Sequence, residues 1–516
     1  MNRNSIFLIA TGVLTVLLVL GIALNVVPFG IPEVWVWKYQ PIEVPARLVF
    51  PCIGMAVLLG ALALPVRHLL LQAQQLPSPA RRMEWLALGA LWLAAVLLSL
   101  GVALLHPWGL MHTASLIFSI GPNSYYYTAL QHHDMLALLQ NFDQHMVKLP
   151  LHAQTQSAGP IVLCWGLRRL FDYVPFLQDI ADVLFYFSVG GNSQVVGAQW
   201  SRIIDLPLSA ADVGAALMIA FFFISVGSLT VVPLYFLGKW LYNARVGVWA
   251  AVGFTLLPGF HLFHATVDQM YPFVTTVALC LVTLAVRAPR RGWLYMGAAG
   301  VWLSLAIFMH LGLLTLIVLC VAYGGLLLRR GQSTEQAKEQ PAAPVRSLWS
   351  GLPAFMIGLL APQLLLWILF HYNLIAVLLT SNRLRDALYA ELNRPYLRSL
   401  VGNLIEFLIS AGIPISLLFL WHTGQRVRDL LHRSTSVGAA PLFWSFLLLL
   451  TALELSGKVR GEVARMWIFL TPGLVLIAAA QAQELARNSR FWPAVLIGCQ
   501  FLQLVAFPYF LRVHGY

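Results

Sequence analysis

Long apolar runs alternate with short polar segments along the whole chain. About 20 apolar residues make a helix long enough to cross the hydrocarbon core of a bilayer. Runs of about spanning length lie at 5–28, 46–65, 84–105, 208–237, 246–264, 270–287, 292–309, 311–328, 349–371, 401–421, 438–455, 466–484 and 492–511. The pattern therefore predicts an all-α polytopic membrane protein with about thirteen transmembrane helices.

The amino-acid composition also indicates a protein whose surface is mostly in contact with lipid. Hydrophobic residues make up 59% of the chain and charged residues only 10%, whereas a soluble domain carries about 25% charged residues. The first apolar run is too long for the core of a signal peptide and no small-residue cleavage site follows it, so we expect a retained helix. The five cysteines are scattered and no pair has the spacing of metal ligands.

The distribution of charge predicts the orientation. With the N-terminus in the cytoplasm, more than half of the 32 Lys and Arg residues fall on the inner side, and most of the 20 acids fall outside. Basic inner loops are the usual orientation signal of membrane proteins. We therefore expect the C-terminus and the functional site on the outer (periplasmic or extracellular) face. Because the basic residues serve orientation, no nucleic-acid partner is expected.

The spans and polar segments predict four parts. They are two N-terminal helices with a cytoplasmic linker (1–83), a core with one large outer loop at 106–207 (84–328), a polar cytoplasmic linker (329–348), and a C-terminal half with outer loops at 372–400 and 455–465 (349–516). Apolar stretches inside 106–207 are too short to span, so they predict helices that lie in the membrane interface.

The densest polar cluster, 121–159, holds Asp134 and Asp143 among several Tyr and His residues. A carboxylate at the membrane edge could take the proton of an acceptor hydroxyl or hold a divalent cation. The alternative is a solvated interfacial loop whose Tyr and His side chains anchor at the lipid headgroups.

Two further outer segments carry candidate chemistry. Asp268 stands beside two apolar spans, where an ionisable residue is costly unless it is solvated or paired, although it could simply cap the following helix. Lys458, Arg460 and Arg465 crowd one outer loop and could clamp a phosphate. The alternative for that loop is a salt-bridge cluster neutralised by its own Glu454 and Glu462.

Motifs for cytosolic nucleotide chemistry are missing from the sequence. We find no P-loop, no dinucleotide-binding glycine motif, no HExxH and no nucleophile elbow in a suitable context. Nucleotide sugars are charged and confined to the cytosol. A sugar donor used on the outer face would therefore arrive attached to a lipid.

From about residue 84 to the C-terminus, the order of these features resembles a known superfamily. The large outer loop holds PLHAQTQSAGP, a later outer turn holds VDQMY, and the last outer loop holds GEVARMWIFLTPG. This layout resembles the GT-C glycosyltransferases, which use polyprenyl-phosphate sugars and include protein O-mannosyltransferases, aminoarabinose transferases and oligosaccharyltransferase catalytic subunits. The resemblance implies transfer of a sugar from a polyprenyl-phosphate carrier to a lipid, glycan or protein acceptor.

The resemblance also implies roles for particular residues. Asp134 or Asp143 would be the base or the ligand of a divalent cation, Mg or Mn, and Asp268 would assist. Arg460 or Arg465, with Lys458, would bind the donor phosphate. The implied supporting residues are Tyr125, His152, Glu462 and Arg394.

Two departures from the superfamily pattern keep alternatives open. Asn123-Ser124 stands where an acidic pair is usual, and Gln156-Ser157-Ala158-Gly159 stands where His-Pro-Pro-Gly is usual. A catalytically inactive relative is therefore one alternative, with Glu33 and Glu43 as fallback carboxylates if the chain is active. A transporter or flippase is the other, but its charged groups would lie within the spans, whose interiors here are nearly free of charge.

Overall fold

The structure is a computed structural model, which describes residues 3–26, 29–31, 35–42, 46–72, 81–121, 123–132, 134–332, 343–392, 394–432, 440–486 and 492–512. Glu33 and Glu43 lie outside the described residues. The described chain is almost entirely helical, with four strands of two residues each.

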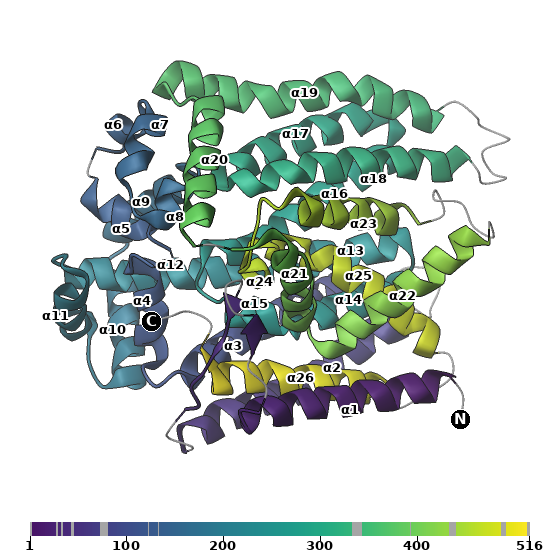
Figure 1. The fold of residues 1–516 in the computed structure, drawn as a ribbon, viewed down its shortest axis with the longest axis horizontal. Helices are drawn as coiled ribbons and strands as arrows, with labels where there is room; N and C mark the ends of the chain where they lie inside the picture. Colours follow the sequence, from purple (N-terminus) through teal and green to yellow (C-terminus); the bar gives the residue numbers. More distant parts are fainter. Residues whose placement is uncertain are drawn as a thin grey trace.

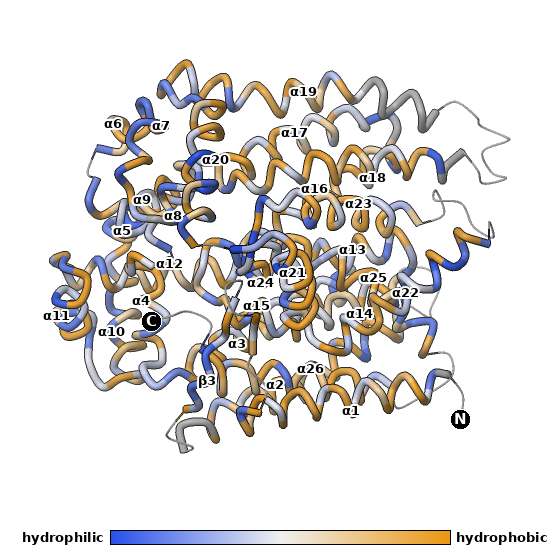
Figure 2. Tube along the Cα trace, in the orientation of Figure 1, coloured by the Kyte–Doolittle hydropathy of each residue, from blue (hydrophilic) through white to orange (hydrophobic). Residues whose placement is uncertain are grey.

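A bundle of long, roughly parallel helices forms most of the molecule (Figure 1). These helices are α1 (Arg3–Ala23), α2 (Ala46–Gln72), α3 (Arg81–Leu105), α12 (Ala210–Ser228), α13 (Val231–Leu241), α14 (Ala244–Thr255), α16 (Tyr271–Arg287), α17 (Gly292–Met309), α18 (Thr315–Gln332), α19 (Ala343–Phe370), α22 (Ile413–Leu431), α23 (Pro441–Ser456), α25 (Thr471–Ala486) and α26 (Trp492–Phe510). Apolar residues cover the middle of the long helices, and hydrophilic residues gather toward the two ends of the bundle (Figure 2). This is the pattern expected of helices whose centres face lipid.

The segment predicted as one large outer loop folds into short helices at the left end of the bundle in Figure 1. They are α4 (Gly109–Phe118), α5 (Tyr125–Gln131), α6 (Met135–Leu139), α7 (Phe142–His145), α8 (Leu151–Gln154), α9 (Gly159–Asp172), α10 (Phe176–Val189) and α11 (Ser193–Ile204). The remaining helices and 3-10 turns are α15 (Pro258–Leu262), α20 (Leu374–Glu391), α21 (Tyr396–Ala411), α24 (Val463–Met466), η1 (Met146–Lys148), η2 (Val267–Met270), η3 (Pro289–Arg291), η4 (Leu311–Leu314) and η7 (Ile468–Leu470).

The predicted fold class, an all-α polytopic membrane protein, is confirmed. In the part of the chain that the structure describes, 10 helices are long and apolar enough to cross a membrane, or 11 if the bent pair α21 and α22 forms one span. The sequence predicted about thirteen. Three expected segments account for the difference: 246–264 is split into α14 and α15, 438–455 gives the shorter α23, and 401–421 is the bent pair.

Local chemistry explains two of these breaks. Pro258 opens α15, where a proline ends the preceding helix because it lacks an N–H and restricts the residue before it. Between α21 and α22 the chain turns by 119° at Gly412, whose φ of +95° favours glycine. Such a break frees backbone groups that lipid cannot satisfy.

Two glutamines of α26 satisfy the freed groups. Gln500 Nε2 donates to the carbonyl of Ala411 at 2.7 Å. Gln503 Oε1 accepts from the N–H of Ile413 at 2.9 Å, and its Nε2 donates to the carbonyl of Ile409 at 2.8 Å. The bend in α21–α22 is therefore held by side chains of the last helix.

The segment that follows α1 meets the last described residues of the chain at one end of the bundle. Strand β3 (Lys38–Tyr39) pairs antiparallel with β4 (Leu511–Arg512), and β1 (Gly30–Ile31) pairs with β2 (Trp35–Val36). Helix α1 begins at the opposite end of the bundle from β4, and it lies beside α26 (Figure 1). The N-terminal segment is thus packed onto the C-terminal helix rather than standing apart.

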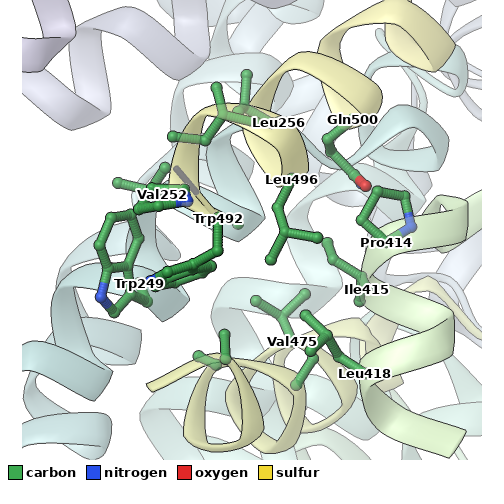
Figure 3. Close-up of a pocket in the computed structure, with 16 residues that line it drawn as sticks. Trp249, Val252, Leu256, Pro414, Ile415, Leu418, Val475, Trp492, Leu496 and Gln500 are labelled. Atoms are coloured by element: carbon green, nitrogen blue, oxygen red, sulfur yellow. The ribbon is translucent and has the colours of Figure 1, made fainter. Parts of the chain in front are cut away.

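A small apolar cavity lies inside the bundle among α14, α22, α25 and α26. It has a volume of about 60 Å³, and Trp249, Ile415, Leu496 and Gln500 are among the side chains around it (Figure 3). Among the described residues that line this cavity, none carries a charge. This cavity therefore offers no group for acid, base or phosphate chemistry.

Candidate functional site

The structure brings two of the predicted site residues together. Asp268 in η2 and Arg465 in α24 form an ion pair, with 3.7 Å between Oδ2 and Nε. Both residues are buried, Asp268 with 8% and Arg465 with 5% of its surface exposed. Each charge would be costly to bury alone, so each stabilises the other at this depth.

A second carboxylate extends this pair toward the surface. Arg465 Nη2 donates to Glu462 Oε2 at 3.0 Å, and Arg394 Nη2 lies 3.5 Å from Glu462 Oε1. The side chain of Glu462 is half exposed. Asp268, Arg465, Glu462 and Arg394 therefore form a row of alternating charges, which we call the charge row, from the protein interior to the surface.

Tyr125 and His152, two predicted supporting residues, lie beside the charge row. Burial and the nearby Asp268 carboxylate raise the pKa of Tyr125, and the Arg465 guanidinium opposes this shift. Burial, followed by Arg465, lowers the pKa of His152 to about 3, and Glu462 opposes the shift. His152 is therefore neutral near pH 7 and acts there as a hydrogen-bonding group rather than as a cation.

Asn123 holds the turn that carries Asp268. Its Nδ2 donates to the carbonyls of Leu116 at 2.7 Å and Ala265 at 3.1 Å, and its Oδ1 accepts from the N–H of Val267 at 3.4 Å. Only an amide can donate and accept in this way. The departure from the acidic pattern at this position thus has a structural role: Asn123 positions Asp268.

The second departure from the superfamily pattern, Gln156-Ser157-Ala158-Gly159, also has a structural role. Gln156 Oε1 accepts from the N–H of Leu311 at 3.4 Å, and Ser157 Oγ donates to the carbonyl of Phe308 at 2.6 Å. A Cβ at Gly159 would lie 2.1 Å from the Phe308 carbonyl oxygen, so only glycine fits there. This stretch fixes the start of α9 against the end of α17.

The remaining predicted carboxylates lie elsewhere. Asp134 is exposed and caps α6, where it accepts from the N–H of Ala137 at 3.0 Å. Asp143 is half-buried in the first turn of α7. Among the described contacts, none joins either residue to Asp268 or Arg465. The structure therefore does not gather them with the charge row.

Arg460 and Lys458 contact the neighbouring outer segment. Arg460 Nη1 donates to the carbonyl of Arg394 at 3.0 Å, and its guanidinium lies over the rings of Tyr389 and Tyr396 at 5.7 and 5.9 Å. Lys458 Nζ lies 3.3 Å from an exposed Asp386 carboxylate. These two cations fasten the last outer loop to α20 and to the start of α21.

Two residues near the charge row, Glu406 and His310, were not predicted. Glu406, 1% exposed, accepts the N–H of Val463 at 3.0 Å and so fixes α24. His310 lies close to Arg385 and Arg465, and burial followed by these cations lowers its pKa to about 3. A glutamate within a predicted span was a signal for Glu406. Nothing in the sequence pattern singled out His310.

The residues around Asp268 do not fit a divalent cation. The charged partner facing this carboxylate is Arg465, whose guanidinium would repel a metal ion. In the described part of the chain, no group of three or more His, Cys, Asp or Glu side chains could hold a metal. The divalent cation implied by the resemblance thus has no ligand set at the charge row.

Comparison with known proteins gives matches among solved structures alone, because no family model and no curated protein matches this chain. The apo oligosaccharyltransferase of Archaeoglobus fulgidus is 13% identical, with a TM-score of 0.44 over 83% of this chain. Its complex with zinc and sulfate is 14% identical, with a TM-score of 0.38 over 82% of this chain. The same organism's oligosaccharyltransferase AglB, in complex with an inhibitory peptide and a dolichol-phosphate, is 13% identical, with a TM-score of 0.40 over 83%. This chain spans about half the length of these proteins, 54% to 56%.

Proposed function

We propose that the protein is an integral membrane glycosyltransferase that moves a sugar from a polyprenyl-phosphate carrier to an acceptor on the non-cytoplasmic face. The observation that carries this proposal is the buried Asp268–Arg465 pair, with 3.7 Å between its charged atoms. Transfer from a lipid phosphate needs a base for the acceptor hydroxyl and a cation for the leaving phosphate. A carboxylate and a guanidinium of these two kinds stand side by side here.

The proposed reaction is an inverting displacement. The acceptor oxygen attacks the anomeric carbon while the bond from that carbon to the phosphate oxygen breaks, and its electron pair leaves with the polyprenyl phosphate. The acceptor proton passes to the Asp268 carboxylate. Arg465 offsets the negative charge that develops on the leaving phosphate. The neutral His152 and the hydroxyl of Tyr125 can hydrogen-bond the sugar.

Asp268 is a better candidate for the base than Asp134 or Asp143. Asp134 is occupied as a helix cap, and Asp143 has no described contact with the charge row. Arg460 and Lys458 act in this proposal by positioning the last outer loop, whereas Arg465 contacts the phosphate. These assignments refine the roles that the sequence resemblance implied.

The location of the site supports the proposed topology. Asp268 lies at one end of the candidate span Val267–Arg287, and Asn123 links its turn to the segment of short helices. A lipid phosphate at headgroup depth would meet such a site at the end of the spans. With the N-terminus in the cytoplasm, this end faces the periplasm or the cell exterior.

The test is a transfer assay on the purified full chain in lipid nanodiscs. Polyprenyl-phosphate hexoses labelled in the sugar serve as donors, extracted membrane lipids and glycans serve as acceptors, and release of polyprenyl phosphate is measured. Asp268→Asn should lower the rate by about 100-fold or more, the usual contribution of a general base. Asp179→Asn, at an exposed position in α10, is the matched control and should leave the rate unchanged. No release by the wild type, or equal rates for both variants, would contradict the proposal.

A further inference from the structure

A second, much larger cavity opens beside the segment of short helices. Its volume is about 710 Å³, within the roughly 300–1,000 Å³ range of small-molecule sites. Its walls come from α4, α11, the turn between α3 and α4, the residues after β3, and β4. Segments from the N-terminal and C-terminal parts of the chain thus contribute to one pocket, which we call the outer pocket.

Aromatic rings form one side of the outer pocket. Trp108 and Trp200 lie edge to face with 5.8 Å between ring centroids, and the rings of His106 and His112 stack at 3.6 Å. All four residues line the pocket. Flat aromatic faces can pack against the C–H face of a sugar ring, because the faces carry partial negative charge and the C–H groups carry partial positive charge.

The polar groups of the outer pocket suit hydroxyls. His106 Nδ1 accepts from the N–H of Trp108 at 3.2 Å, which leaves its Nε2–H as a donor. Burial, followed by Arg512 and His264, lowers the pKa of His106 to about 3, so the ring is neutral near pH 7. Ser119 also lines the pocket, although its Oγ is buried. A sugar hydroxyl can accept from the neutral His106 ring.

In the part of the chain that the structure describes, Arg512 is the one charged residue that lines the outer pocket. Its Nη1 donates to the carbonyl of Pro508 at 2.9 Å, and pairing of β4 with β3 fixes its backbone. Among the described residues that line the pocket, none is a carboxylate that would neutralise this cation. The outer pocket therefore favours a ligand with one anionic group.

We propose that the outer pocket binds the acceptor, a saccharide that carries one phosphate or carboxylate. Its sugar ring packs on Trp108 and Trp200, its hydroxyls meet His106, and its anionic group meets Arg512. This assignment rests on the proposed function, since it names the acceptor class of that reaction.

Asn123 connects the outer pocket to the charge row. The carbonyl of Leu116, a pocket residue, accepts from Asn123 Nδ2 at 2.7 Å, while Asn123 Oδ1 holds the N–H of Val267 next to Asp268. The ring centroid of His112, a pocket residue, lies 6.4 Å from that of His264. His264 precedes Asp268 by four residues. A saccharide in the outer pocket therefore sits against the same wall that fixes the proposed base.

Binding is tested without donor or turnover, by saturation-transfer NMR on the full chain in neutral-lipid nanodiscs. The probes are glucose 6-phosphate, glucuronate, glucose and inorganic phosphate. Both anionic sugars should bind at least about tenfold more tightly than glucose or phosphate. Arg512→Gln should abolish this preference for the anionic sugars, and Trp200→Leu should weaken binding of all three sugars. If inorganic phosphate bound as tightly as glucose 6-phosphate, the pocket would recognise only the anionic group, and the proposal would be wrong.

Two matched variants control for folding. Arg202→Gln changes an exposed cation on α11 outside the pocket lining, and it should bind like the wild type. Trp200→Phe keeps an aromatic face and should retain binding within about threefold. Equal binding by the wild type, Arg512→Gln and Trp200→Leu would refute the site.

The same variants in the transfer assay separate the two proposals. Saccharide binding without any transfer by the wild type would refute the glycosyltransferase and keep the pocket as a glycan site. Transfer that is unaffected by Arg512→Gln and Trp200→Leu would refute the acceptor role and leave the glycosyltransferase standing.

Discussion

The carboxylate of Glu406 in α21 accepts the backbone N–H of Val463 at 3.0 Å, so a fully buried acid caps the short helix that carries Arg465. Glu406 therefore links α21, the helix that ends at the Gly412 bend, to α24, the helix that carries Arg465 of the charge row. Its contact is with backbone rather than with the Asp268–Arg465 pair. We assign it a positioning role.

Glu406→Ala should destabilise the protein and lower its transfer rate, because the N–H groups at the start of α24 lose their acceptor. Loss of a buried acceptor costs about 1–3 kcal/mol. Glu406→Gln keeps one carbonyl oxygen for Val463 and should be milder in both respects. Thermal unfolding in nanodiscs measures the difference, and an alanine variant as stable as the glutamine variant would rule out the cap.

Asn123→Asp restores an acid at the position where the superfamily pattern has one, yet it should weaken the protein. The new carboxylate oxygen would face the carbonyls of Leu116 and Ala265, which now accept from the amide. We expect a loss of about 1–3 kcal/mol and a slower reaction. If Asn123→Asp unfolded at the wild-type temperature and gained activity, position 123 would be a catalytic position and the positioning role would be wrong.

Gly412→Ala should destabilise the bend between α21 and α22. A Cβ there would lie 2.3 Å from Gln500 Nε2, and φ at this residue is +95°. A non-glycine residue in such a conformation costs about 1–3 kcal/mol. Gly424→Ala in α22 is the matched control, since nothing lies within 4 Å of its Cβ position. That change should be neutral or slightly stabilising, and equal losses for both variants would contradict the account of the bend.

Stability should fall as the solution is acidified from about pH 6.5 toward pH 3. The pKa values of His106 and His152 are lowered to about 3 in the folded protein, whereas an unfolded chain has a histidine pKa of about 6.5. Between these values the unfolded chain binds more protons, so the stabilisation is complete above pH 6.5 and is lost as the pH falls. Each of these two histidines changes the free energy of unfolding by at most about 1.4 kcal/mol per pH unit.

The check is the unfolding temperature at about pH 7.5 and pH 5. The wild type should unfold at a lower temperature at pH 5. The double variant His106→Gln, His152→Gln should lose less on acidification, because two of the responsible groups no longer titrate. The same loss in both proteins would assign the acid sensitivity to other groups.

The sequence was informative where a charged residue occupied a position at which the surrounding pattern disfavours a charge. Asp268 beside two apolar spans and Arg465 in a loop expected on the outer face both conflicted with the local pattern, and the structure pairs them. Asp134 shows the opposite case. It stood in the richest polar cluster, yet its carboxylate caps a helix, as an Asp before a helix often does.

The features that the sequence did not predict depend on contacts between distant segments. The run 401–421 looks like one continuous span, and its bend at Gly412 is stabilised by Gln500 and Gln503 of the last helix. The outer pocket needs the pairing of β3 with β4, which lie more than 400 residues apart in the sequence. Periodicity along a chain carries no information about such partners.

The central claim is that Asp268 and Arg465 act as one unit in transfer, and a double-mutant cycle tests it most directly. Release of polyprenyl phosphate is measured for Asp268→Asn, Arg465→Gln and the double variant, each with its unfolding temperature. Residues that act as a unit give strongly non-additive losses, so the double variant should be no slower than the slower single variant. Losses that multiply, with all three proteins folded, would show two independent residues and contradict the account.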